Sequence, residues 1–164
     1  MTVPNIKTVT TPSVPWCQPE TAATLAQGLP LRSHVELRPV PTSARLARLH
    51  ARNALRDWHM TCLADTVEVL VSEIVSNAIR ASARVPRQRR DPSGPRIQLW
   101  LASDLRSVLI QVWDGDRHHP VRQEPAPDAE AGRGLLLVEA LSQQWGSYAP
   151  DGQSGKIVWA VCAQ

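Results

Sequence analysis

The sequence has no phenylalanine, a single tyrosine and few cysteines or lysines. Its three cysteines, Cys17, Cys62 and Cys162, are odd in number and far apart, which excludes a disulfide framework and a CxxC metal pair. Reduced thiols are typical of a reducing cytosol, so a cytoplasmic protein is expected. Arginine supplies nearly all the positive charge, because Lys7 and Lys156 are the only lysines.

Long apolar runs are also absent. No stretch approaches the roughly 20 apolar residues of a membrane-spanning helix, and the N-terminus has no signal-peptide pattern, so no membrane partner is expected. The net charge of +3 is too small for a dedicated nucleic-acid-binding protein. The arginines between 84 and 90 leave nucleic-acid binding as a third-ranked alternative, because no aromatic residue is interleaved with them.

The 164 residues are enough for one domain with one core. Residues 1–30 are rich in threonine and proline and have no hydrophobic period, which predicts a flexible N-terminal leader. The folded domain is therefore expected over residues 31–164.

Hydrophobic periodicity predicts the elements of that domain. A strand at 34–38 precedes a helix that Thr42 or Ser43 can cap, and whose apolar residues recur near helical spacing: Leu46, Leu49 and Leu55. The clearest element is a helix over 64–83, with one apolar face made of Val67, Leu70, Val71, Ile74, Val75 and Ala78.

The second half of the chain reads mainly as strands. The expected elements are strands at 97–101 and 108–113, a long polar loop at 114–131, a helix at 135–144, and strands at 145–149 and 156–163. The predicted fold is α+β, a two-layer sandwich of a mixed, mainly antiparallel sheet with the helices on one face.

Two polar residues lie on the strongest predicted helix. Glu73 and Asn77 are four residues apart, so they share a helix face at the margin of the apolar stripe, where a cleft can open. An amide oxygen is a hard ligand suited to Mg²⁺, and a carboxylate can accept a proton from a nucleophile. On its own, the helix fits an ordinary polar surface better than a site.

Two further features follow along the chain. Asp114 ends a buried strand, where a carboxylate can accept a hydrogen bond from an exocyclic amine, although Asp-Gly is also a common turn. Gly132, Arg133 and Gly134 open a helix after the long loop, and a helix N-terminus preceded by glycines suits a phosphate. His118 and His119 are interpreted as loop residues, since no ligand cluster accompanies them.

In combination these segments resemble the GHKL, or histidine-kinase-like, ATPase superfamily. The segment Val71–Ser82 is similar to its N box, Val112–Asp116 to its first glycine box and Gly132–Leu141 to its second. Trp145-Gly146 and the segment Gly155–Trp159 are similar to the ending of small anti-sigma-factor serine kinases. The resemblance covers about residues 34–163 and implies the ATP-binding fold named after Bergerat.

The resemblance also implies roles for single residues and two cofactors, ATP and Mg²⁺. Asn77 would bind the Mg²⁺ that bridges the phosphates, Glu73 would be the catalytic base, and Asp114 with its neighbour Gly115 would bind adenine. The segment 132–134, that is Gly132, Arg133 and Gly134, would contact phosphate, and Trp113 would lie beside the nucleotide. The implied partners are a sigma factor, an anti-anti-sigma protein and a second copy in a homodimer.

One departure from the family pattern is clear. Asp116 and His118 stand where the first glycine box usually has glycines. Two functions therefore compete: a serine kinase that also sequesters a sigma factor, and a nucleotide-binding or protein-interaction module without kinase activity.

Overall fold

The computed structural model describes residue 26 and residues 28–86, 94–121 and 133–163. Most of the predicted leader, residues 87–93 with most of the basic run, and part of the predicted loop at 114–131 lie outside these residues. The described elements, in chain order, are β1 (Leu31–Leu37), α2 (Ser43–Asp57), the short 3₁₀ helix η2 (Thr61–Leu63), α3 (Ala64–Arg84), β2 (Ile97–Ser103), β3 (Ser107–Asp114), α4 (Gly134–Leu141), β4 (Gln144–Tyr148) and β5 (Lys156–Ala163).

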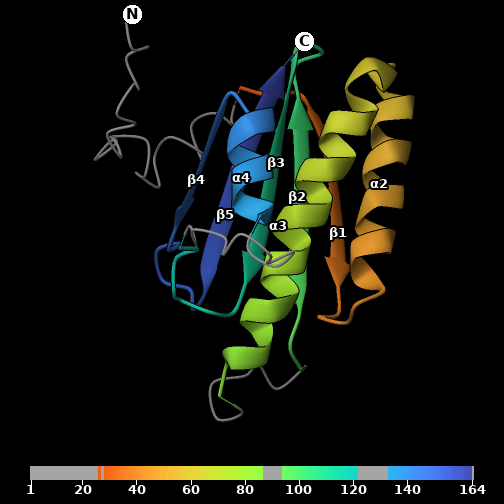
Figure 1. Ribbon diagram of the computed structural model, residues 1–164. Helices are drawn as coiled ribbons and strands as arrows, with labels where there is room; N and C mark the ends of the chain where they lie inside the picture. Colours follow the sequence, from red (N-terminus) through yellow and green to blue (C-terminus); the bar gives the residue numbers. More distant parts are fainter. Residues whose placement is uncertain (1–25, 27, 87–93, 122–132, 164) are drawn as a thin grey trace, which may run out of the picture.

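The strands form one sheet in the order β1-β2-β3-β5-β4. All four pairings among these strands are antiparallel, so the sheet has none of the parallel pairing that a mixed sheet would contain. Figure 1 shows α2, α3 and α4 on the same face of the sheet, with α3 crossing its middle. The predicted α+β two-layer sandwich is confirmed, and the strand predicted at 34–38 is the edge strand β1, which begins earlier, at Leu31.

The main core lies between the helices and the sheet, and α3 contributes most to it. All six residues predicted for the apolar face of α3 are buried: Val67, Leu70, Val71, Ile74, Val75 and Ala78. They contact the alternate residues of β2, β3 and β5 that point toward the helices. Among the described residues, no helix is long and apolar enough to cross a membrane.

Helix α2 buries a different face from the one that its leucines suggested. Leu46 and Leu49 are 53% and 54% exposed, whereas Ala47, Ala51 and Leu55 are buried. Residues four apart share a helix face, and alanines let α2 approach α3 and β1 closely. The prediction that Leu46 and Leu49 belong to a core-facing stripe was therefore wrong, because the small residues make the contact.

Two predicted helix ends also differ in the structure. The side chains of Thr42 and Ser43 make no cap hydrogen bond to α2, and the Ser43 hydroxyl donates instead to the carbonyl of Arg38, at 2.6 Å. The helix predicted to reach Gln144 ends at Leu141, because Ser142 is already extended and the chain enters β4.

The pairing of β3 with β5 positions the site described below. In this register the last residue of β3, Asp114, lies opposite the first residue of β5, Lys156. Gly155, just before Lys156, has a φ of +99°, and a Cβ there would overlap the carbonyl oxygen of Asp114. Glycine is therefore required at the turn that brings Lys156 alongside Asp114.

Candidate functional site

A pocket of about 600 Å³ opens between α3, the start of α4 and the chain that follows β3. Its wall includes Asn77, Arg80 and Arg84 from α3, Gly134 from α4, and three residues near the sheet end: Asp116, His118 and Lys156. This volume lies within the range of small-molecule and cofactor sites.

A buried ion pair lies at the sheet end of the pocket, with Lys156 in the pocket wall and Asp114 behind it. Asp114 and Lys156 are 1% and 4% exposed, and the Lys156 ammonium lies 2.8 Å from Asp114 Oδ1. The same oxygen accepts the backbone N–H of Asp116 at 2.9 Å. Burial raises the pKa of Asp114, although the charge of Lys156 acts against the shift. Asp114 Oδ2 is buried and has no hydrogen-bond partner among the described residues.

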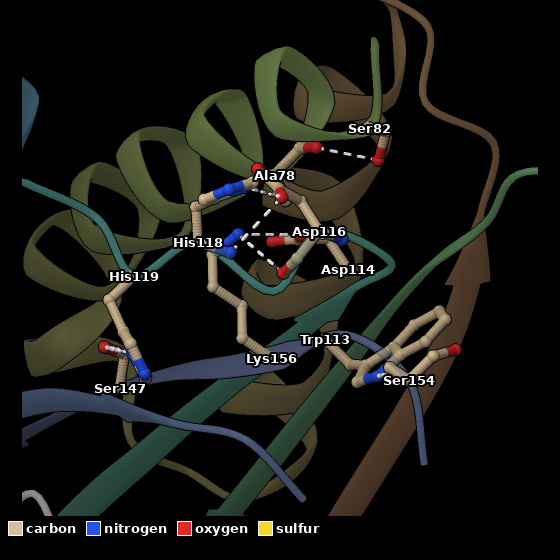
Figure 2. Close-up of polar contacts among 10 residues, drawn as sticks. All are labelled: Ala78, Ser82, Trp113, Asp114, Asp116, His118, His119, Ser147, Ser154 and Lys156. Atoms are coloured by element: carbon tan, nitrogen blue, oxygen red, sulfur yellow. Dashed lines mark hydrogen bonds and ion pairs between the residues drawn. The ribbon is translucent and has the colours of Figure 1, made fainter. Parts of the chain in front are cut away.

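Asp116 lies next to this pair, as Figure 2 shows, and is itself 5% exposed. Its Oδ1 accepts the backbone N–H of His118 at 3.2 Å and lies 2.6 Å from the ring Nδ1. Burial acts to raise the pKa of Asp116, but the hydrogen bonds from His118 outweigh it and lower the pKa below its usual value. Asp116 Oδ2 is buried without a partner in the described part of the chain.

The helical wall of the pocket carries a predicted metal ligand and two cations. Asn77 is half-buried, as expected for the margin of the apolar stripe, and its Oδ1 accepts a hydrogen bond from Arg80 Nη2. Arg84 continues this wall one turn further along α3. The guanidinium groups suit phosphate oxygens, but Arg80 must release Asn77 Oδ1 before that oxygen can bind a metal ion.

Glu73 contacts the start of α4. A Cβ added to Gly134 would overlap the Glu73 carboxylate, so a larger residue at the first position of α4 would displace that side chain. Helix α4 has no side-chain cap, which leaves its first backbone N–H groups available to an anion. Asn77 lines the pocket. Glu73 lies one helical turn away from Asn77 and does not line it.

The remaining predicted site residues lie around the pocket. Asp114 and Gly115 are not in its wall; Asp114 lies behind Lys156 and Asp116, to which it is hydrogen-bonded. Arg133 is exposed just before α4, and Gly132 lies outside the described residues. The structure thus gathers Glu73, Asn77, Asp114 and Gly134 around one pocket, and their roles toward a nucleotide stay predictions.

Trp113 was predicted beside the nucleotide; it is not in the pocket wall, and its indole N–H donates to the carbonyl of Ser154 at 3.1 Å. Arg80 and Lys156 line the pocket, and the sequence analysis predicted no role for them. Arg84 also lines the pocket, whereas it was considered only as part of the basic run between 84 and 90. Two features of the sequence could have identified Arg80 and Lys156. Arg80 follows Asn77 by three residues, and Lys156 is a single lysine at the start of an apolar strand.

The residues of the pocket fit a nucleotide. Asp116 Oδ2 in the wall and Asp114 Oδ2 behind it are buried and have no donor among the described residues, and a base amine could supply one. Arg80 and Arg84 provide positive charge for phosphates. The described residues contain no group of three or more His, Cys, Asp or Glu that could hold a metal ion, so Mg²⁺ would rely on Asn77 and on the phosphates themselves.

Comparison with known proteins supports this fit. Residues 37–162 match the histidine kinase-like ATPase domain, a range that runs from the end of β1 to the end of β5 and includes the whole pocket. Among curated proteins, no match is found. The matched range covers well over half of the chain, which therefore belongs to the histidine kinase-like ATPase family and carries an ATP-binding domain.

Proposed function

We propose that this protein is a serine kinase and anti-sigma factor, which phosphorylates a small anti-anti-sigma protein and sequesters a sigma factor. The observation that carries the proposal is the position of Glu73, one helical turn from Asn77 on α3 and against the first residue of α4. A carboxylate at the edge of a nucleotide pocket is where a kinase needs a proton acceptor.

The chain's own residues then have distinct tasks. Glu73 accepts the proton of the attacking serine hydroxyl, and Asn77 Oδ1 would hold the Mg²⁺ once Arg80 leaves it. The freed Arg80 and its neighbour Arg84 hold phosphate oxygens, together with the N–H groups that open α4. Bound Mg-ATP supplies the phosphoryl group and the metal that neutralises its charge, so catalysis rests mainly on positioning.

The partners rest on the resemblance of the N box, the second glycine box and the chain ending to anti-sigma-factor kinases. The same resemblance suggests a homodimer and a cytoplasmic location.

The test is phosphate transfer from γ-labelled ATP, with Mg²⁺, to purified anti-anti-sigma proteins from the same genome. We expect serine phosphorylation of one of them by the wild type and its loss in Glu73→Gln, with Mg-ATP binding retained. Glu68→Gln is the matched control, because Glu68 lies on the same helix, pairs with Arg52 and does not line the pocket. Transfer that persists in Glu73→Gln would remove Glu73 from the role of base.

A second candidate is a nucleotide-binding module that acts through protein contacts without turnover. It is favoured by the contact of Arg80 with Asn77 Oδ1 and by Asp116 and His118 at positions where the family has glycines. Saturable Mg-ATP binding together with no transfer and no hydrolysis, with every partner tested, would select this candidate over the kinase.

A further inference from the structure

A second apolar cluster lies on the face of the sheet opposite α2, α3 and α4, the three helices that Figure 1 shows on the other side. It consists of four buried residues: Ala102, Leu109, Tyr148 and Trp159. Ala102, Leu109 and Trp159 alternate along their strands with residues of the main core, which places their side chains on the opposite face. Trp159 is fully buried, and its indole Nε1 has no hydrogen-bond partner among the described residues. This face is therefore an apolar surface that a further segment can cover.

A pocket of about 540 Å³ lies on this opposite face, beside the cluster. The sheet residues Trp100, Gln111, Tyr148 and Ile157 line it. His34 of the edge strand β1 also lines the pocket and stacks on Trp100, with the ring centroids 5.0 Å apart, so the indole is held in place. Grooves lined by aromatic side chains are typical of sites that bind proline-rich segments in the polyproline II conformation.

The N-terminal chain enters the described part of the structure at this pocket. Ala26 lines the pocket, and Leu29 packs against the apolar cluster. Arg32 donates to the carbonyl oxygens of both, from Nη2 to Ala26 at 2.8 Å and from Nε to Leu29 at 3.3 Å. These contacts hold Ala26 and Leu29 against the sheet, so residues 1–25 are tethered to the domain at the pocket itself.

The leader contains a segment that suits such a groove. Residues 12–19 carry no charge and include Trp16. Three of these residues are prolines: Pro12, Pro15 and Pro19. The spacing of the first two is that of a PxxP ligand, whose backbone is extended before it binds and loses little entropy. Pro19 precedes Ala26 by seven residues. Seven residues of extended chain span about 23 Å, so the segment can reach the pocket from its tether.

We propose that residues 12–19 of this chain dock on the pocket in cis as an extended strap, with their proline and tryptophan rings against Trp100 and Tyr148. The tether keeps the effective concentration of the strap on the order of millimolar, which favours it over a separate partner. A second copy that packed flat against this face would have to displace Ala26 and Leu29. The inference involves no nucleotide and does not depend on the proposed function.

The experiment measures how fast an alkylating reagent reacts with Cys17, which lies inside the proposed strap. It uses the full chain with Cys62→Ala, because the exposed Cys62 would also react. Cys162 does not interfere, because it is 2% exposed and burial raises the pKa of its thiol to about 11. A docked strap protects Cys17, since the reagent reaches the thiol only while the strap is open.

Two variants of this parent chain release the strap from opposite sides of the contact. Trp100→Ala removes an aromatic wall of the pocket, and Pro12→Ala with Pro15→Ala changes only the leader and leaves the core of the domain intact. In each we expect Cys17 to react about tenfold faster than in the parent. Gln98→Ala is the matched control, because Gln98 precedes Trp100 by two residues on the same face of β2 and does not line the pocket. Its rate should stay within about twofold of the parent rate. Circular dichroism establishes that each variant is folded.

The protein concentration distinguishes the occupants of the pocket. Protection in cis is the same at every concentration, which is the expected result. Protection that appears only as the concentration rises would give the contact to a second copy and overturn docking in cis. Equal rates in the parent and in all variants would mean that the strap does not dock on this pocket. A faster reaction in Trp100→Ala alone would overturn the polyproline contact.

Discussion

An aspartate lies at each end of strand β3, and the two have opposite surroundings. Asp104, three residues before the strand, is exposed, and its Oδ1 accepts three hydrogen bonds, from the backbone N–H groups of Arg106 and Ser107 and from the Ser107 hydroxyl. Asp114, the last residue of β3, is buried, is paired with Lys156, and keeps one oxygen without a described partner.

The two aspartates also differ in the direction of their pKa shifts, and this difference distinguishes a carboxylate that stabilises a turn from one at a candidate binding site. Hydrogen bonds from Ser107 and Arg106 lower the pKa of Asp104, so its ionised form stabilises the turn. Burial raises the pKa of Asp114, so keeping its charge behind the pocket wall costs free energy. Buried groups with shifted pKa values cluster at functional sites, which is consistent with the role predicted for Asp114.

The largest expected effect comes from removing the partner of the buried carboxylate. Lys156→Met leaves Asp114 without its counter-charge, and we expect the free energy of unfolding to fall by about 3–5 kcal/mol. At the other end of the strand, Ser107→Ala removes one hydrogen bond to Asp104 and should cost about 0.5–1.5 kcal/mol. Urea unfolding at pH 7 measures both, and equal losses would contradict the distinction between the two ends.

The affinity for nucleotide is also expected to differ between variants of Asp114 and Asp104. Asp114→Ala removes the residue that holds both Lys156 and Asp116, and we expect the affinity for Mg-ATP to fall on the order of 10–100-fold. Asp104→Ala should leave the affinity unchanged, because Asp104 is not in the pocket wall. Calorimetry measures the affinity of each variant for Mg-ATP, after circular dichroism has shown that the variant is folded. Similar losses of affinity in the two variants would mean that the affinity depends on general stability and not on Asp114.

The smallest effect is on the pH dependence of stability. The folded pKa of Asp104 lies below its reference value of 3.8, so its contribution is present above that pH and is lost as the pH falls through the lowered pKa. The stability gap between wild type and Asp104→Asn should therefore be present at pH 6 and narrow below pH 3.8.

For Asp114 the sign is reversed. Its folded pKa lies above 3.8, so the folded state binds the proton more tightly than the unfolded state does. The wild type should lose stability relative to Asp114→Asn as the pH rises from 3.8 through the raised pKa. Urea titrations between pH 3 and 7 test both; gaps that change in the same direction would refute the assignment of opposite pKa shifts.

Elements with a strong hydrophobic period were predictable from the sequence. The buried face of α3 consists of the expected residues, because the apolar face of this helix packs against the apolar side of the sheet. In α2 the spacing of the leucines did not indicate the buried face. Alanines make the close contact with α3, and the larger Leu46 and Leu49 are exposed. Hydrophobicity alone does not report which face of a helix can approach its neighbour most closely.

The sequence by itself determined the α+β class, the helix carrying Glu73 and Asn77, and the glycine that opens α4, because these depend on local period and spacing. Only the tertiary structure decided that Lys156 pairs with Asp114, 42 residues away, and that Asp116 in the pocket wall has a buried oxygen without a partner among the described residues. The physical reason is that strand register places these side chains together, and the partners of a buried charge come from strands that are adjacent in the sheet but distant along the chain.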